Sequence, residues 1–180
     1  MSGLRNMLLE PRFVRISHVL TIVVPLAWWS ICYAIWVHKG CRAFLPFISE
    51  FDMWEPEDTI FTVGVSLTAV LLLIRMLQLY FAQRPRIRRF ELGRKWSVLH
   101  ELTLVPGTLG VCCAAGLAFV PWNDNLPLHV ALADCIFYSG VTWCIAATSL
   151  TWRLSKIVPA LTKGLRWRIR GSVVAAVSLI

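Results

Sequence analysis

The run TIFTVGVSLTAVLLLIRMLQLYF, Thr59 to Phe81, decides the fold, because it is long and carries a single charged residue, Arg75. A helix needs roughly 20 apolar residues to cross a hydrocarbon core of about 30 Å. Three further runs are long enough: Ile16 to Val37, Val98 to Val120 and Leu126 to Trp152. With 57% hydrophobic residues among 180 and a mean hydropathy of +0.65, the sequence predicts an all-α, polytopic bundle of transmembrane helices.

The two ends of the chain carry further apolar signals. The first run follows Arg12 and Arg15 and exceeds the 7 to 15 residues of a signal-peptide core, and no A-x-A cleavage pattern follows it. We therefore expect it to remain as a signal anchor. A fifth run begins at Gly171 and has reached about half of a membrane thickness at Ile180. We therefore expect a truncated chain or fragment with four complete spans and the start of a fifth.

Basic residues alternate between the connecting segments. Of the 18 Lys and Arg, three precede the first run, two lie in loop 38–58, six in loop 82–97, none in loop 121–125 and six in loop 153–170. The positive-inside rule places the N-terminus and loops 82–97 and 153–170 in the cytosol. Loop 38–58, which carries Glu50, Asp52, Glu55, Glu57 and Asp58, is then exoplasmic or lumenal, away from the anionic inner leaflet.

The net charge of +8 arises at the flanks of apolar runs, so we expect membrane lipids, including anionic inner-leaflet lipids, as partners, and no nucleic acid. Membrane-protein partners stay open. Six residues are predicted to contact lipid headgroups: Arg84, Arg86, Arg88, Arg89, Arg94 and Lys95. The segment Arg153 to Arg170 has apolar residues at helical spacing and can lie in the membrane interface, although Pro159 interrupts it. The alternative is that both segments only set topology.

Polar side chains inside the spans are costly and each suggests a hypothesis. Asp134 and Ser66 lie at similar predicted depths. Asp134 either accepts a hydrogen bond from Ser66, Thr68 or a water, which clamps two helices, or it is an acid that titrates protons or contacts lipid. Arg75 is expected to snorkel toward the cytosolic face. His129 lies at the exoplasmic boundary near the acidic loop, either as a hydrogen-bonding cap or in a catalytic or pH-sensing role. Its five-residue separation from Asp134 places the two on different helix faces.

Proline, small residues and cysteine complete the local signals. Pro25 and Pro106 are expected to bend their helices. Gly110 and Ala114 favour either close helix packing or a hinge. Only Cys41 lies in an exoplasmic loop, so no disulfide framework is expected. No His/Cys spacing typical of a metal site occurs, and we expect neither metal nor cofactor.

The exoplasmic segment can be interpreted from its own residues. Pro46 and Pro56 bracket a stretch that cannot be continuous helix. Four apolar side chains are expected to dip into the membrane interface while the carboxylates stay in water; they are Phe47, Ile48, Phe51 and Trp54. Glu57 and Asp58 fall at the start of the second span, where the helix dipole favours negative charge.

One spacing in this segment resembles a known family. It consists of Pro46, Phe47, Ile48, Ser49, Glu50, then Pro56, Glu57 and Phe61. The pattern resembles that of the Frag/DRAM/Sfk family, which includes damage-regulated autophagy modulators, a Golgi post-GPI-attachment-to-proteins factor and the N-terminal membrane domain of a fungal cell-wall biogenesis protein. The resemblance implies about six spans and places the motif in the first exoplasmic loop. "AAGLAF" (Ala114 to Phe119) and Leu128–His129 also look like family positions.

Three positions distinguish branches of that family. Autophagy modulators often carry glycine where Asp52 stands and asparagine where Ser66 stands, whereas Trp54 to Pro56 look more like the GPI-related and cell-wall branch. The resemblance therefore implies a non-catalytic membrane factor that supports GPI-anchor lipid remodelling, with the Golgi or ER favoured over lysosome or plasma membrane. An autophagy or lysosome modulator, or a phosphoinositide-kinase recruiter acting through its basic loops, is the second possibility.

An enzyme of another class is the rival. A membrane-embedded lipid acyltransferase or hydrolase would use His129 or Asp134 as acid or base near the exoplasmic headgroups. Against it, the sequence has no nucleophile and base at recognisable spacing, no metal motif and no phosphate-binding loop. A transporter is a third option through a titrating Asp134, but no inverted repeat is visible.

Overall fold

The computed structural model describes residues 2–41 and 48–177, and within this part every regular element is helical. Four helical segments are long and apolar enough to cross a membrane: Pro11–His38, Glu57–Arg89, Arg94–Leu117 and Leu126–Ser155. The prediction of an all-α bundle with four spans is confirmed. In chain order the elements are α1 (Ser2–Leu8), α2 (Pro11–His38), the 3-10 helix η1 (Ile48–Asp52), α3 (Glu57–Arg89), α4 (Arg94–Leu102), α5 (Leu104–Leu117), α6 (Leu126–Ser155), the 3-10 helix η2 (Pro159–Leu161) and α7 (Thr162–Val177).

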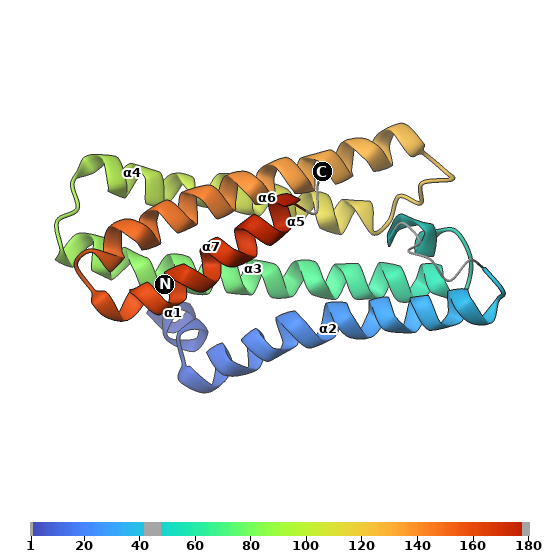
Figure 1. Cartoon of the computed structure of the whole chain (residues 1–180), viewed down its shortest axis with the longest axis horizontal. Coiled ribbons are helices and arrows are strands. Elements are labelled where there is room, and N and C mark those ends of the chain that lie inside the picture. Colours follow the sequence, from blue (N-terminus) through green and yellow to red (C-terminus); the bar gives the residue numbers. More distant parts are fainter. Residues whose placement is uncertain (1, 42–47, 178–180) are drawn as a thin grey trace.

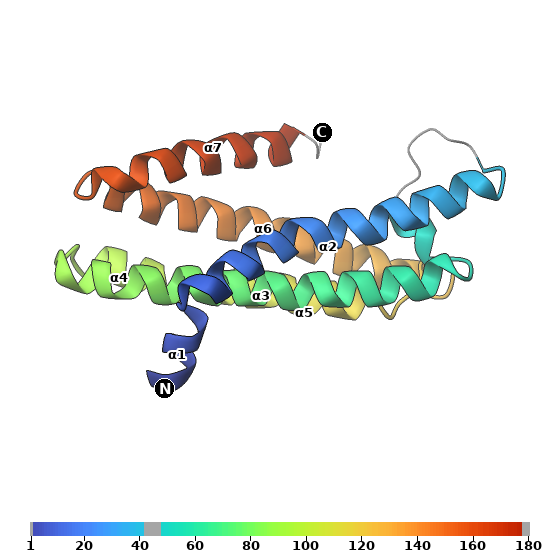
Figure 2. The ribbon, with the colours of Figure 1, turned by 90° about the horizontal axis from the view of Figure 1, so that it is seen from below.

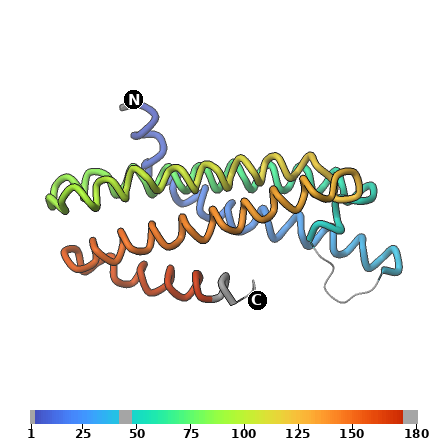
Figure 3. The backbone as a smooth tube through the Cα atoms, turned by 90° about the horizontal axis from the view of Figure 1, so that it is seen from above, coloured from blue at the N-terminus to red at the C-terminus, as the bar shows by residue number. Residues whose placement is uncertain are grey.

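The four long segments run side by side with alternating direction (Figure 1). Helix α3 packs against α2 on one side and α5 on another, and α5 packs along α6. Helix α7 turns back along the C-terminal half of α6 (Figure 2). Helix α1 projects from the bundle (Figure 2 and Figure 3). We call the end formed by residues 39–41, 48–56 and 118–125 the acidic end, and the end formed by residues 82–97 and 153–168 the basic end.

Glycines allow the helices to approach closely at two points. A Cβ on Gly64 of α3 would lie 2.3 Å from Cγ of Trp28, whose indole packs across the helix and donates to Thr68 Oγ1 at 3.3 Å. A Cβ on Gly110 of α5 would lie 2.5 Å from Oγ of Ser139 on α6. The close-packing interpretation of Gly110 is therefore confirmed, because small residues are what allow two helix backbones to approach.

The third span is divided where a proline removes a backbone donor. Helices α4 and α5 meet at Thr103, whereas α2 continues through Pro25. Pro106 lies in the first turn of α5 and has no N–H for the carbonyl of Leu102, so the chain restarts as a new helix. The Thr103 hydroxyl donates to the carbonyl of His100 at 2.7 Å, which satisfies one acceptor left at the break.

Two helices are longer than their apolar runs. Helix α3 continues past Phe81 to Arg89, so the predicted loop 82–97 is largely helical. Basic residues in the last turn of α3 interact favourably with the negative end of the helix dipole, which supports this extension. Helix α7 begins at Thr162, within the predicted loop 153–170, instead of at Gly171.

Candidate functional site

The family-like motif folds onto the acidic end of the bundle. Pro46 and Phe47 lie outside the described residues, and the motif continues as η1. Phe51 of η1 is fully buried, with its ring 6.0 Å from that of Trp36 in an edge-to-face arrangement. It belongs to an apolar cluster of Cys32, Phe51, Phe61 and Leu117. The segment that connects α2 to α3 is therefore anchored through its own core residue.

Asp52 and His129 form a buried pair beside this cluster. Their side chains are 2% and 5% exposed, and His129 Nδ1 lies 3.5 Å from Asp52 Oδ2. The same nitrogen lies 2.7 Å from the carbonyl oxygen of Val120. Burial raises the pKa of the Asp52 carboxyl from 3.8 to about 6, although the imidazole of His129 favours the charged form. Among the described residues neither oxygen of this carboxyl has a hydrogen-bond partner.

A second pair, in which only the acid is buried, holds the start of α3. Lys39 Nζ lies 2.5 Å from Glu57 Oε2 and donates to the carbonyl oxygen of Glu55 at 2.8 Å. The Glu57 side chain is 3% exposed and that of Lys39 is 37% exposed. Glu57 and Asp58 occupy the first turn of α3, as predicted. This ion pair joins the end of α2 to the beginning of α3 at the motif.

The expectation that these carboxylates stay in water is wrong for Asp52 and Glu57. Both are 2% exposed, because Asp52 lies at the end of η1 against His129, and Glu57 lies in the first turn of α3 against Lys39. Phe51 is likewise in the core instead of at the membrane interface. Of the four apolar side chains expected at the interface, Ile48 and Trp54 are exposed, at 55% and 63%, and Phe47 lies outside the described residues.

Asp134 and Ser66 are not brought together. Asp134 is exposed on the outer side of α6, while His129 five residues earlier is buried, so the predicted separation of their helix faces is confirmed. The Oγ of Ser66 is buried on α3 with no hydrogen-bond partner. The predicted clamp between these residues is therefore wrong, because α5 lies between α3 and α6 over much of the bundle.

Arg75 lies within a polar contact between α2 and α3. Its Nη1 donates to Gln78 Oε1 at 2.7 Å, one turn closer to the basic end. Gln78 Nε2 also donates to Ser17 Oγ of α2 at 3.0 Å, and Ser17 and Gln78 are both nearly inaccessible. The direction of the Arg75 side chain agrees with snorkelling, and its carboxamide partner satisfies part of the guanidinium.

The predicted headgroup-contact residues gather at the basic end. Five of them are exposed: Arg86, Arg88, Arg89, Arg94 and Lys95. Arg84 differs, because its Nε lies 3.6 Å from Glu101 Oε1, and Glu101 also accepts a hydrogen bond from the Tyr80 hydroxyl. Contact of these residues with lipid stays a prediction.

The motif at the acidic end belongs to a stretch of the chain that matches a known family. A family model described as the Frag1/DRAM/Sfk1/Cwh43P N-terminal domain matches residues 13–180. The chain belongs to this family. The matched range contains the motif and all four spans, so this Frag1/DRAM/Sfk1/Cwh43P-type chain is an integral, multi-pass membrane protein. Searches of curated proteins and of solved structures give no significant match.

Sequence reasoning on this Frag1/DRAM/Sfk1/Cwh43P-type chain missed the partners that complete its acidic end. His129 was expected near the acidic loop, but Asp52 was not identified as its partner, nor Lys39 as that of Glu57. The available signal was that Asp52 directly follows the aromatic residue Phe51 in a predicted loop. In a single sequence this pattern is weak evidence for a buried pair. Within the described residues, no three His, Cys, Asp or Glu side chains gather where they could hold a metal ion.

Proposed function

We propose that the protein is a non-catalytic membrane factor that supports the remodelling of GPI-anchor lipids in the secretory pathway. The observation that carries this proposal is the buried Asp52–His129 pair beneath the family motif. Autophagy modulators of the family often carry glycine at the position of Asp52, and a glycine offers no side chain for this pair. The pair in this chain therefore supports the branch that Trp54 to Pro56 also resemble.

The arrangement of the candidate acid and base residues supports a role without catalysis. His129 is 5% exposed, and its Nδ1 is already close to the Val120 carbonyl and the Asp52 carboxylate. Asp134 lies on another face of α6 and is exposed. A lipid hydrolase or acyltransferase needs its acid, base and nucleophile around one reacting atom, and His129 and Asp134 do not converge. In the described part of the acidic end, Phe51 and Asp52 are buried and the outer surface carries Ile48 and Trp54.

The test uses cells that lack their own remodelling factor and express a GPI-anchored reporter. Full-length protein is expected to restore retention of the reporter at the cell surface. Asp52→Gly is expected to reduce rescue, because it removes the pair, whereas Asp134→Asn on the exposed face retains it. Protein abundance and localisation are measured for every variant.

Other outcomes distinguish the alternatives. Absence of rescue by normally expressed wild-type protein contradicts the proposal and favours the autophagy or phosphoinositide function, for which the exposed basic residues of the other end would be tested. Loss of rescue in Asp134→Ala and His129→Ala at normal abundance and thermal stability would instead favour the enzyme.

A further inference from the structure

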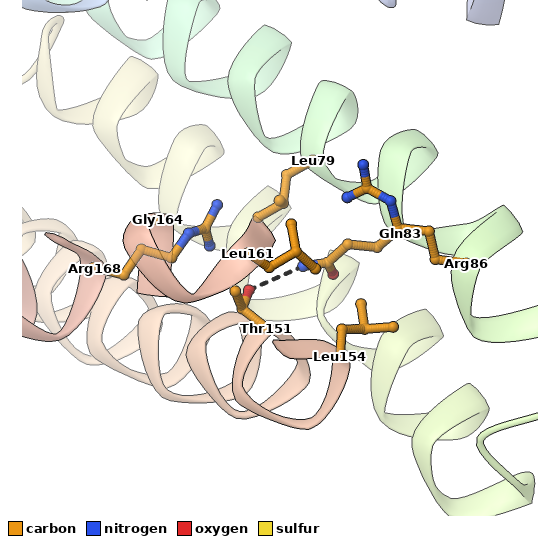
Figure 4. A pocket seen from close by; sticks show the side chains of 8 residues that line it. All are labelled: Leu79, Gln83, Arg86, Thr151, Leu154, Leu161, Gly164 and Arg168. Carbon is orange, nitrogen blue, oxygen red and sulfur yellow. Dashed lines mark hydrogen bonds between the residues drawn. The ribbon is translucent and has the colours of Figure 1, made fainter. Parts of the chain in front are cut away.

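A cavity of about 170 Å³ lies between α3, α6 and α7 at the basic end (Figure 4). Its apolar wall is formed by Leu79, Leu154 and Leu161. Since a water molecule takes about 30 Å³ in the liquid, this space accommodates several waters or one small polar group. The cavity is at the opposite end of the bundle from the Asp52–His129 pair and is unused by the proposed function.

The floor of the cavity is polar and well buried. Gln83 of α3 and Thr151 of α6 are 4% and 6% exposed. Gln83 Nε2 donates to Thr151 Oγ1 at 3.1 Å, and Thr151 Oγ1 donates in turn to the Ala147 carbonyl at 2.8 Å. A carboxamide nitrogen carries two hydrogens. Gln83 therefore has a second N–H to offer to an acceptor in the cavity.

Two arginines flank this floor. Figure 4 shows Arg168 projecting from α7 and Arg86 from α3, on opposite sides of the Gln83–Thr151 hydrogen bond. Among the described residues no acidic side chain forms an ion pair with either guanidinium. Arg168 is half-buried and also experiences the positive charge of Arg75. A cation that is partly buried near a second cation is unfavourable unless an anion accompanies it.

The depth of the cavity matches that of lipid headgroups. The apolar run of α3 ends at Phe81, and the cavity wall on α3 extends from Leu79 to Arg86. The apolar run of α6 ends at Trp152, and its wall extends from Thr151 to Leu154. The cavity thus straddles the predicted boundary between hydrocarbon and headgroups, on the side that the positive-inside rule makes cytosolic.

We propose that this cavity binds a phosphate group, carried by the headgroup of an anionic membrane lipid. Arg86 and Arg168 act as the two cationic contacts and Gln83 as a neutral donor. Guanidinium groups bind phosphate oxygens through paired, charge-assisted hydrogen bonds. The leucine wall accommodates the glycerol and the first acyl carbons, and basic pockets between transmembrane helices on the cytosolic side are known sites for anionic headgroups.

The experiment uses the full-length protein in phosphatidylcholine nanodiscs with or without phosphatidylserine. Thermal unfolding midpoints and lipids retained in native mass spectrometry are recorded. Phosphatidylserine is expected to raise the midpoint of wild-type protein, because a ligand that binds only the folded state stabilises it. Arg168→Gln is expected to weaken retention by about tenfold or more. The matched control Arg166→Gln removes the same charge from an exposed position of α7 and is expected to lose less than about fivefold.

The substitution Gly164→Leu tests the contribution of the cavity space without changing the charge of the protein. Gly164 lines the cavity, and a Cβ added there would meet nothing within 4 Å, so the fold can accept the substitution. All charges are unchanged, yet the larger side chain reduces the space for a phosphate. Retention of phosphatidylserine is expected to fall as in Arg168→Gln, and this variant also decides the case if Arg168→Gln does not fold.

Two results would overturn the site. One is an equal loss in Arg168→Gln and Arg166→Gln, and the other is an undiminished response in Gly164→Leu; either assigns the effect to diffuse surface charge. Inorganic phosphate added to the protein in a sugar-based detergent, which carries no phosphate group, distinguishes the source of the ligand. A midpoint shift that Gly164→Leu abolishes would show that soluble phosphate also binds, and no shift would restrict the ligand to a lipid.

Discussion

The two ends of the helix bundle differ in whether their charged side chains have partners. At the acidic end the pairs Lys39–Glu57 and Asp52–His129 join residues of the α2–α3 connection to α3 and α6, beside a cluster of apolar side chains. At the basic end most arginines are exposed, and Arg168 faces a cavity without an acidic partner among the described residues. Buried carboxyl groups that meet a lysine or a histidine hold a chain segment in place, whereas cations without partners leave binding capacity for the surroundings. The first end is therefore built as a cap, and we propose that the second is a surface for anions.

The largest expected effect is loss of the aromatic anchor of the cap. Phe51→Ala is expected to lower the free energy of unfolding by about 3–5 kcal/mol, because Phe51 is fully buried in the apolar cluster. Chemical denaturation of the detergent-solubilised protein, followed by circular dichroism, measures this change. Trp54→Ala in the same segment is the control, since Trp54 is 63% exposed. An equally large loss in both variants would contradict the distinction between buried anchor and exposed ring.

Breaking the Lys39–Glu57 pair is expected to have the next largest effect. Lys39→Met leaves the Glu57 carboxylate, which is 3% exposed, without its cation. We expect a loss of about 2–3 kcal/mol, below the value for a fully buried pair because Lys39 itself is 37% exposed. A double-mutant cycle with Glu57→Gln measures the coupling. If Lys39→Met/Glu57→Gln is no more stable than Lys39→Met, the two side chains do not stabilise each other.

Asp52 is expected to make the stability of the cap depend on pH. Its pKa is about 6 in the folded protein and 3.8 as the ordinary value, so the folded state holds this proton more tightly. Stability is therefore greatest below about 4 and falls as the pH rises toward 6, by on the order of 2 kcal/mol for this group.

The groups that face Asp52 are His129 on α6 and Asp58 on α3. Asp52→Asn keeps the shape of the side chain and removes its titration. Unfolding midpoints between pH 4 and 6 are expected to decline less in Asp52→Asn than in the wild type. Parallel declines in the two proteins would show that other groups titrate.

The smallest effect is expected at the basic end. Arg88→Gln removes an exposed charge near the end of α3 and is expected to change the free energy of unfolding by less than about 0.5 kcal/mol. The same denaturation assay measures it. A loss as large as that of Lys39→Met would mean that the basic end is held together by its charges, and the comparison between the two ends would fail.

Helix positions were predictable to different degrees. The fourth span was expected from Leu126 and α6 begins there, because Asn125 caps a proline-containing first turn: its side chain accepts from the backbone N–H of Leu128 at 3.2 Å. The end of α3 was placed eight residues too early, since hydropathy reports where lipid ends and not where backbone hydrogen bonding ends. The break at Thr103 was expected only as a bend near Pro106.

The candidate site was predictable only in part. His129 was expected near the acidic loop and lies beside Asp52, but the predicted contact of Ser66 with Asp134 does not form. Helix periodicity placed His129 and Asp134 on different faces correctly, because both belong to one helix. It could not show which of these faces is buried, since this depends on the neighbouring helices.

The sequence by itself determined the membrane-spanning helices and the separation of acidic from basic residues. These properties follow from the length, hydropathy and charge of contiguous segments, which are local quantities. Only the tertiary structure decided that Asp52 meets His129, that Lys39 meets Glu57, and that Arg86 and Arg168 share one cavity. Such contacts join residues far apart in the chain, and they depend on the rotation and depth at which each helix packs against its neighbours.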